Sequence, residues 1–434
     1  MAEMVPDLLS FIDRSPTPYH AVAEAVVRLT AAGFGPVSEA DLWDFGPGQS
    51  GYVIRGDGSL AAFQVGTTSP AEAGFRILGA HTDSPNLRLK PDPDVSAHGY
   101  RQLAAEPYGG VLLHTWLDRD LSIAGRVVTE TEEGVQTTLI DFARPLLRIP
   151  NLAIHLFREI REKGLKLDPQ KHLVPVVGLE STPPIRELLA TELRAQGLVN
   201  ASPGQLLSFE LMLYDTQPSS VIGSRGEFIS APRLDNLASS HAVLTSLIRA
   251  EAHGAVPFTR VVVLYDHEEV GSRSAQGAAG TFLVDILDRI ASGYKGGEPQ
   301  AMARAAATSH MISVDMAHAV HPNYSDRHES GHHPVVGRGP VIKFNSNQSY
   351  ATDAETAGAF SALCRSQNIT PQHFVTRSDL ACGSTIGPIM ASQTGIQTVD
   401  VGSPMLAMHS CREMAGAEDV GPMIDVLTAF YTGG

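Results

Sequence analysis

Residues with metal-ligand side chains stand close to short apolar runs of this 434-residue sequence. They are two histidines and three carboxylates: His81, Asp235, one of the adjacent pair Glu268 and Glu269, Asp315 and His409. Imidazole and carboxylate groups are ligands that suit zinc, manganese or cobalt. One carboxylate that bridges two ions, with one further carboxylate and one histidine on each ion, would account for all five. Paired ions about 3.5–4 Å apart activate water and polarise a carbonyl group, so the set predicts a dinuclear hydrolytic centre.

The adjacent glutamates Glu268 and Glu269 predict a division of labour. One would bind metal while the other stays free as general base, and their spacing does not say which. Asp83, two residues after His81, would hold that imidazole in the correct tautomer without binding metal itself. Taken singly, a Glu-Glu pair is usually a solvated surface feature and an Asp-Asn pair is usually a helix cap. The coincidence of all these residues with strand-like runs favours the metal centre.

The elements that must position these residues follow from hydrophobic periodicity. Short apolar runs, typical of central strands covered on both faces, stand at 75–80, 260–265, 311–314 and 398–401. Helical spacing occupies 5–32, with a turn at SPTPYH, and returns at 237–252 and 353–366. This alternation predicts a three-layer α/β catalytic domain with a central mixed sheet. In such a sheet, ligands gather beyond the carboxyl ends of the strands.

Residues 91–231 differ in sequence pattern, because turn-forming residues alternate there with short strand-like runs. This pattern predicts an inserted, β-rich second domain. Expected strands are at 111–113, 126–131, 136–140 and 206–214, and the return linker is at 216–226. The catalytic domain is then discontinuous and comprises residues 1–90 and 232–434.

The composition excludes several function classes. With 32 basic and 47 acidic residues, the net charge of −15 argues against a nucleic-acid partner and against an anionic membrane surface. The odd cysteine count (Cys364, Cys382 and Cys411) argues against a disulfide framework and for a reducing compartment. The sequence has neither a signal-peptide pattern at its start nor an apolar run of membrane-spanning length. We therefore expect a cytoplasmic protein.

Several long motifs occur in order along the chain. They include HTDSPNLRLK, YGGVLLHTWLDRDLSIAGRV, SAPRLDNLASSHA, DHEEVGS, SVDMAHAVHPNY and GPVIKFNSNQSYA. Together the motifs resemble the aspartyl aminopeptidase family of dinuclear zinc exopeptidases, as a bacterial member. The resemblance extends from SFIDRSPTPYHAV to the C-terminus. It departs from the family pattern at LLH (112–114) and in a short C-terminus, and neither departure touches a proposed ligand.

The resemblance implies a role for each candidate residue. The implied metal ligands are His81 and Asp315 on one zinc, Glu269 and His409 on the other, and Asp235 as the bridge, with Glu268 as general base. The implied substrate-site residues are His318, Tyr350, Lys343 for the acidic side chain of the first residue, and His155 in the inserted domain. Family members place this histidine in the active site of the neighbouring subunit. Related enzymes are homodimers built into tetrahedral dodecamers, in which the inserted domain makes the dimer contact.

Other interpretations remain open at this stage. The enzyme would be a dinuclear aminopeptidase of broader specificity if Lys343 were an ordinary solvent-facing strand residue, or a scaffold of the same fold if catalysis were lost. Retention of Glu268 and of every proposed ligand argues against the scaffold. His155 would alternatively be a core residue or a metal ligand in its own right. The histidines between 310 and 333 would form a separate metal tract, although a loop near the active site is the preferred interpretation. Cys382 lacks the context of a nucleophile.

Overall fold

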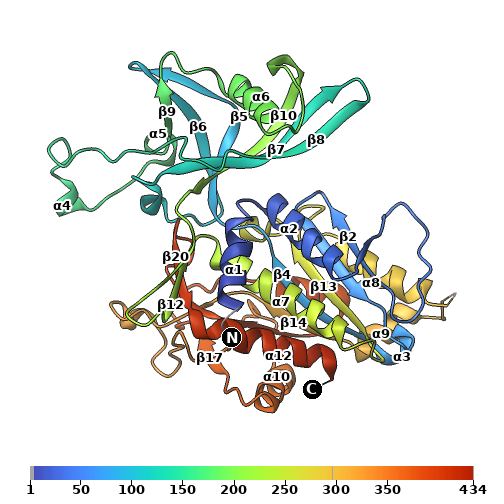
Figure 1. The fold of residues 1–434 in the computed structure, drawn as a ribbon. Helices are drawn as coiled ribbons and strands as arrows, with labels where there is room; N and C mark the ends of the chain where they lie inside the picture. Colours follow the sequence, from blue (N-terminus) through green and yellow to red (C-terminus); the bar gives the residue numbers. More distant parts are fainter. Residues whose placement is uncertain (1–3, 296, 434) are drawn as a thin grey trace. The chain divides into compact units, whose positions relative to one another are not determined.

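The computed structural model describes residues 4–295 and 297–433. The chain divides into two compact units (Figure 1). Unit 1 consists of Met1–Asp83, Ser219–Met408 and Glu413–Gly434, and unit 2 consists of Ser84–Pro218 and His409–Arg412. The units therefore divide near residues 83 and 218, whereas the predicted domain boundaries were 90 and 231. The difference arises because strand β5 of unit 2 already begins at Asn86, and because β11 and β12 pair within a sheet of unit 1.

Within the described residues, unit 1 contains a nine-stranded mixed sheet in the order β1-β2-β3-β13-β4-β14-β18-β16-β17. Its strands are β1 (Gly35–Pro36), β2 (Ser50–Arg55), β3 (Ser59–Gln64), β4 (Phe75–His81), β13 (Thr259–Tyr265), β14 (His310–Val314), β16 (Val341–Phe344), β17 (Gln372–Val375) and β18 (Gln397–Gly402). The four central strands, β13, β4, β14 and β18, are parallel, and β3 and β16 pair with them antiparallel. These four are the strands that the apolar runs predicted.

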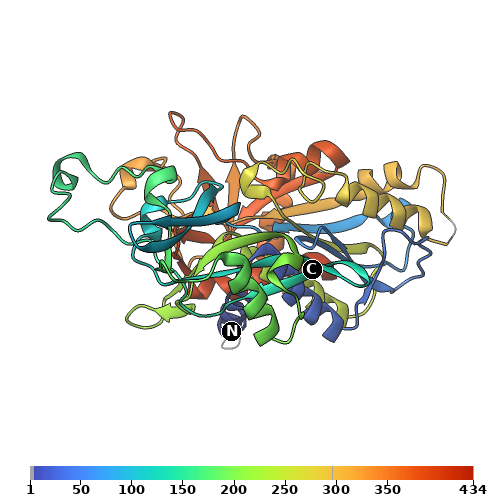
Figure 2. The same cartoon turned by 90° about the horizontal axis from the view of Figure 1, so that it is seen from above.

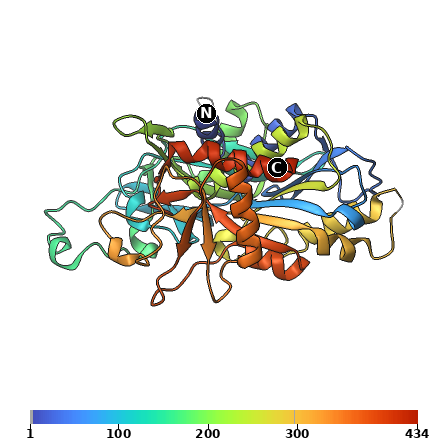
Figure 3. The same ribbon diagram turned by 90° about the horizontal axis from the view of Figure 1, so that it is seen from below.

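Helices cover both faces of this sheet. One face packs against α1 (Met4–Asp13), α2 (Pro18–Ala31), α7 (Leu234–Ala252), α10 (Ala354–Ser366) and α12 (Val420–Thr432). The other packs against α3 (Pro70–Ala73), α8 (Phe282–Gly293), α9 (Ala301–Thr308) and α11 (Ile386–Thr394). Alternate strand residues serve the two cores, since Leu78 faces the first layer and Ile77 the second. Figure 3 shows β4 (blue) between α12 (red) and α8 (gold), and Figure 2 shows the gold helices beside the same blue strand; this arrangement confirms the predicted three-layer α/β architecture.

A second sheet of unit 1 has five strands in the part of the chain that the structure describes. Its order is β11 (Ser220–Ile222), β12 (Phe228–Ala231), β20 (Glu413–Gly416), β19 (Pro404–Leu406) and β15 (Ala317–His318). The predicted linker 216–226 thus contains a short strand. This small sheet carries His318, one of the residues expected at the substrate site.

Unit 2 is built on a six-stranded sheet as far as its residues are described. The order is β8 (Gly134–Asp141), β7 (Leu121–Thr131), β10 (Leu206–Asp215), β5 (Asn86–Ala97), β6 (Tyr100–Tyr108) and β9 (Val176–Leu179). Its helices are α4 (Ile160–Lys163), α5 (Pro169–His172) and α6 (Ile185–Ala195), and α6 packs Leu189 and Leu193 onto the sheet. The strand expected at 111–113 is wrong. Leu113–Trp116 forms a 3-10 turn instead, in which Thr115 bonds back to the carbonyl of Leu112.

Candidate metal centre

Three neighbouring parallel strands deliver the first group of candidate ligands to one edge of the large sheet. Strand β4 ends at His81, opposite Tyr265 at the end of β13, and β14 ends one residue before Asp315. The chain leaves β13 through a single 3-10 turn at Glu268–Val270. These strands lie side by side in Figure 1. The expectation that distant residues meet beyond their carboxyl ends is therefore met for this group.

His81 is the centre of this cluster and is 1% exposed. Its Nε2 lies 3.6 Å from Oδ1 of Asp235, 3.7 Å from Oδ1 of Asp315 and 3.8 Å from Oε2 of Glu268. Two ligand atoms that are each about 2.1 Å from a zinc ion lie about 3.4 Å apart at a tetrahedral angle. The nitrogen of His81 and the carboxylate oxygens of Asp235 and Asp315 thus have spacings that fit one metal ion.

Asp235 reaches the cluster because the chain around it is not a regular helix. Arg233 has a left-handed backbone (φ 55°), and Asp235 itself (φ −83°, ψ 104°) departs from helical geometry although it lies at the start of α7. The backbone N–H of Asp235 donates to Glu413 at 3.0 Å, and the side-chain amide of Asn236 donates to the carbonyl of Val314 at 3.0 Å. These bonds fix the turn, and the interpretation of Asp235 as an ordinary helix cap does not hold. No sequence motif pointed to Glu413 as a partner of Asp235.

Asp83 supports the same cluster without facing the metal position. Its Oδ1 and Oδ2 accept the backbone N–H groups of Glu268 and Glu269, both at 3.1 Å. Nδ1 of His81 lies 3.0 Å from the carbonyl oxygen of Asp83 and 3.3 Å from its Oδ1. A proton on Nδ1 leaves Nε2 as the metal-binding nitrogen. One fully buried carboxylate therefore connects the imidazole to the turn that carries both glutamates.

The electrostatics of the cluster fit a bound cation. Burial raises the pKa of Glu268 to about 8, and burial together with the charge of Asp235 raises the pKa of Glu269 well above its usual range. Burial lowers the pKa of His81, but the charge of Glu268 and the hydrogen bonds to Asp315 and Asp83 outweigh it, so the net shift is upward. The donor set thus concentrates negative charge in a buried space. A divalent ion would neutralise it.

Lys343 is buried beside this cluster and is not the solvent-facing strand residue of the alternative interpretation. Its side chain is 3% exposed, and its Nζ lies 3.2 Å from Oδ2 of Asp315 and 3.2 Å from the carbonyl oxygen of Met316. This charge lowers the pKa of Asp315 although burial opposes the shift. Because Lys343 holds one oxygen of Asp315, the other oxygen is the one that faces His81.

The other substrate-site candidates of unit 1 form a wall next to Lys343. Nζ of Lys343 lies 5.2 Å from the ring centroid of Tyr350. Tyr350 and His318 both contact Phe374, with ring centroids 6.4 and 5.6 Å apart. Sequence reasoning missed Phe374, which occupies β17 without any chemical motif around it. The wall therefore combines predicted polar residues with an aromatic side chain that only the fold brings to them.

The comparison with known proteins decides the family. The family model described as "Aminopeptidase I zinc metalloprotease (M18)" matches residues 11–431. The chain belongs to the M18 family. It is 47% identical over 433 residues to the probable M18 family aminopeptidase 2 of Pseudomonas aeruginosa PAO1 and 48% identical over 434 residues to that of Stutzerimonas stutzeri A1501, covering 99% of this chain and 98% of each relative.

Solved structures agree with this assignment. The cryo-EM structure of an Ape4 and Nbr1 complex matches with a TM-score of 0.95 and 39% identity, over 100% of this chain and 86% of that one. The crystal structure of yeast aminopeptidase 1 matches with a TM-score of 0.85 and 30% identity, over 99% and 96%. The predicted resemblance is confirmed at the level of an M18 zinc metallo-aminopeptidase.

Two predicted site residues of this M18 chain lie in unit 2. His409 belongs to the short segment that groups with unit 2, where its Nδ1 lies 3.1 Å from the carbonyl oxygen of Gly110 and its own carbonyl accepts the N–H of Leu112 at 3.1 Å. Such a contact at Nδ1 favours a tautomer whose Nε2 is available to metal. His155 is exposed in a turn at 154–156, and it is in none of the candidate ligand groups found among residues 4–295 and 297–433.

The later histidines of the tract bond within their own loop. Nε2 of His328 accepts the backbone N–H of His321 at 3.0 Å, and His332 lies 2.5 Å from a carboxylate oxygen of Glu329. None of these residues joins a candidate ligand group in the described part of the chain. A separate metal tract therefore finds no support.

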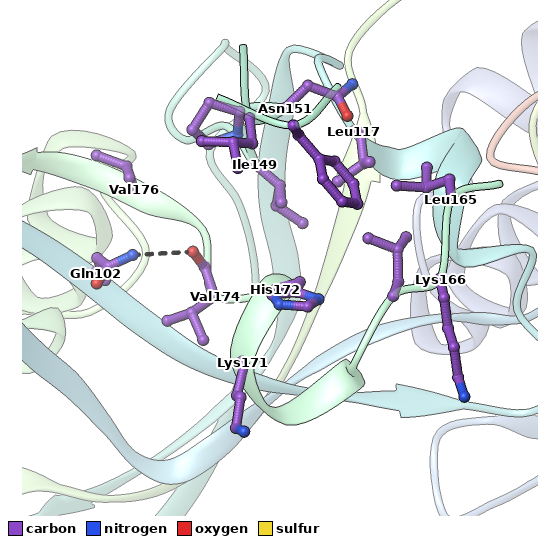
Figure 4. A pocket seen from close by; sticks show the side chains of 14 residues that line it. Gln102, Leu117, Ile149, Asn151, Leu165, Lys166, Lys171, His172, Val174 and Val176 are labelled. Atoms are coloured by element: carbon purple, nitrogen blue, oxygen red, sulfur yellow. Dashed lines mark hydrogen bonds between the residues drawn. The ribbon is translucent and has the colours of Figure 1, made fainter. Parts of the chain in front are cut away.

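Unit 2 also contains a cavity of about 370 Å³ (Figure 4). Most of its wall is apolar, as at Ile149, Leu165 and Val176, and the amide of Gln102 donates to the carbonyl of Val174 at 3.2 Å. No carboxylate is present among the described residues that line it, so this cavity lacks the ligands of a hydrolytic metal centre.

In the part of the chain that the structure describes, no helix has the length and apolar character required to cross a membrane. The cysteines Cys364, Cys382 and Cys411 are free thiols.

Proposed function

We propose that this M18 enzyme removes an acidic first residue, Asp or Glu, from peptides by water attack at two divalent metal ions, of which zinc is the family metal and manganese or cobalt suit the same donors. The observation that carries the proposal is a buried cation beside the ligand cluster. A lysine ammonium has three donors and no acceptor. Lys343 commits two of them to Asp315 and to the carbonyl of Met316. The third is available to a substrate carboxylate.

The roles of the other residues follow from chemistry that the site supports. We assign His81 and Asp315 to one ion, Glu269 and His409 to the other, and Asp235 to the bridge between them. When bound, the two ions would supply Lewis acidity that polarises the scissile carbonyl and acidifies water. Glu268 would accept the proton of the attacking water and pass it to the leaving amine. Its side chain is 14% exposed and its Oε2 is 3.8 Å from His81, a position at the border between ligands and solvent.

We also propose that the chain functions as a homo-oligomer. The solved S. cerevisiae mApe1 dodecamer matches it with a TM-score of 0.85 and 30% identity. By analogy with the family, unit 2 (the inserted domain) would make the dimer contact, and dimers would assemble into a tetrahedral dodecamer. His155 would then complete the substrate site of a neighbouring subunit. An exposed His155 suits such a role. Three free thiols agree with a cytoplasmic location.

The test uses anilide substrates of Asp, Glu, Asn and Leu, with and without a chelator. The proposal expects chelator-sensitive cleavage that favours Asp and Glu. Equal cleavage of the Leu substrate would indicate the broader-specificity aminopeptidase, and no cleavage by metal-loaded protein would indicate the inactive scaffold.

A matched pair of variants tests the assignment of the glutamates. Glu268→Gln should lose about 10²- to 10⁴-fold in rate while metal content stays near normal. Glu269→Gln, the same chemical change one residue away, should lose metal. The reverse pattern of metal contents would exchange the two roles.

A further inference from the structure

Another buried carboxylate is bonded to the segment that carries Tyr350, part of the wall next to Lys343. Asp400 stands in β18, directly beside β14, and is completely buried. It belongs to none of the candidate ligand groups among the described residues. Sequence reasoning assigned it no role, because it is one polar residue inside an apolar strand. A buried carboxylate outside the metal cluster needs another reason to be there.

The hydrogen bonds of Asp400 connect the strand to two irregular segments. Its Oδ2 accepts the backbone N–H of Ala351 at 2.6 Å, and its Oδ1 accepts the hydroxyl of Thr385 at 2.7 Å. Its own backbone N–H donates to Oγ1 of Thr352 at 2.9 Å. Segments 345–353 and 376–385 have no helix or strand of their own to hold them. One side chain therefore supplies fixed anchors to both.

These two segments carry residues of the wall. Tyr350 directly precedes Ala351, and Cys382 lies three residues before Thr385. Tyr350 belongs to a small apolar cluster with Phe374, and Cys382 packs against that cluster. Displacement of either anchor would move the surface that faces the ammonium of Lys343.

A carboxylate accepts from both groups at once. An amide could still accept the N–H of Ala351 through its oxygen, but its NH₂ group would then face Thr385, whose hydroxyl would have to turn and act as acceptor. The carboxylate also packs closely against the backbone of α11, because a Cβ added at Gly387 would lie 2.3 Å from Oδ2 of Asp400. The carboxylate is thus tightly seated between the strand, the two segments and the first turn of α11.

We propose that Asp400 is a positioning residue that fixes the Tyr350 wall opposite Lys343 and so sets the affinity for the first residue of the substrate. This inference rests on the proposed site of substrate recognition. It predicts that loss of the carboxylate weakens substrate binding and leaves the metal centre and the chemical step intact.

The test compares Asp400→Asn with the wild-type enzyme at full metal loading. We expect KM for the Asp substrate to rise about 10- to 100-fold, about the value of a hydrogen bond to a charged group, while kcat and metal content stay within about threefold. Calorimetry with L-aspartate, the product, should show the same weakening without turnover. Thr385→Val removes only one of the two anchors and should give a smaller rise, and it serves if Asp400→Asn does not fold.

Asp419→Asn is the matched control. Asp419 is equally buried and accepts the backbone N–H groups of Gly337 and Gly339 at 2.6 and 2.8 Å. It should lower thermal stability with little change in KM. The inference would be overturned by any of three results. These are an unchanged KM in both Asp400→Asn and Thr385→Val, a fall in kcat alone in these variants, or an equal rise of KM in Asp419→Asn. If the wild type cleaves only the Leu substrate, the proposed specificity fails, and KM for that substrate then decides the role of Asp400.

Discussion

Replacement of Lys343 by methionine removes the ammonium and its three contacts within the protein. The ammonium is bonded to Asp315 and to the carbonyl of Met316, and it lies against the ring of Tyr350. Methionine is similar in length and apolar, so it fills most of the same buried space. The change therefore tests the charge of the residue with little effect on packing.

Two losses have an expected size: the proposed bond to the substrate carboxylate and the bond to Asp315. A charged hydrogen bond to the substrate carboxylate is worth about 1.5–3 kcal/mol, which corresponds to about 10- to 150-fold in the preference for Asp over Asn. The bond to Asp315 supports a proposed metal ligand, and loss of such support typically lowers metal affinity or activity about 10- to 100-fold. Because of this contact with Asp315, neutral substrates such as those of Asn and Leu should also slow until excess zinc restores the metal.

The assay measures kcat/KM for Asp, Glu, Asn and Leu substrates at increasing zinc concentration. In Lys343→Met, the neutral substrates should recover at high zinc, whereas the ratio of Asp to Asn should stay low. Lys343→Arg should not restore the ratio, because a planar fork does not replace a compact ammonium in this space. An Asp-to-Asn ratio that stays at the wild-type value in Lys343→Met would refute the proposed source of acidic specificity.

Three further changes have clear expected results. Asp83→Asn should lower kcat/KM about 10- to 100-fold, because an amide has a single oxygen and cannot accept the N–H groups of Glu268 and Glu269 with two separate oxygens. Unaltered kinetics would exclude an orienting role. His155→Ala should be inactive yet assemble and bind metal, and co-expression with Glu268→Gln should restore some activity if subunits share sites; verified mixed dimers without activity would argue against sharing. Asp7→Asn should lower the free energy of unfolding by about 1 kcal/mol at pH 7, since nearly half of Asp7 is exposed. The hydrogen bond to His241 lowers the pKa of Asp7, so this stabilisation is fully present above the usual pKa of an aspartate and is lost progressively as the pH falls toward the lowered pKa; in urea titrations, a difference that does not decline as the pH falls below about 4 would contradict the assignment.

The central part of the fold was predictable because burial leaves a local trace in the sequence. The strands at β4, β13, β14 and β18 are covered on both faces, so each is a short continuous apolar run. Parallel strands end at one edge, and His81 and Asp315 therefore meet although 234 residues separate them. The strand expected at 111–113 failed for the opposite reason. Three apolar residues after a Gly-Gly pair are too few to distinguish a strand from a turn anchored by Trp116 in the core.

The supporting residues were less predictable because their partners are set by tertiary structure. Glu413 accepts a hydrogen bond from the backbone N–H of Asp235, which lies 178 positions away in the sequence. No sequence motif near either residue indicates this contact. A buried strand residue such as Phe374 carries no chemical signal until its neighbours are known. Spacing can reveal a ligand that follows a strand, but it cannot reveal which backbone N–H group a distant carboxylate will accept.

The candidate metal ligands and the wall that contains Tyr350 are held by different parts of the fold. The candidate ligands at β4, β13 and β14 depend on strand ends, whose positions are fixed by two packed cores. The wall that contains Tyr350 depends on irregular segments held through Asp400 and Thr385. Under the proposed function, substitutions in those segments would alter the shape offered to the first residue of a peptide without moving a strand. We therefore expect that substrate preference can change while the proposed metal centre stays the same, and the variants of Asp400 and Lys343 should separate the two properties by experiment.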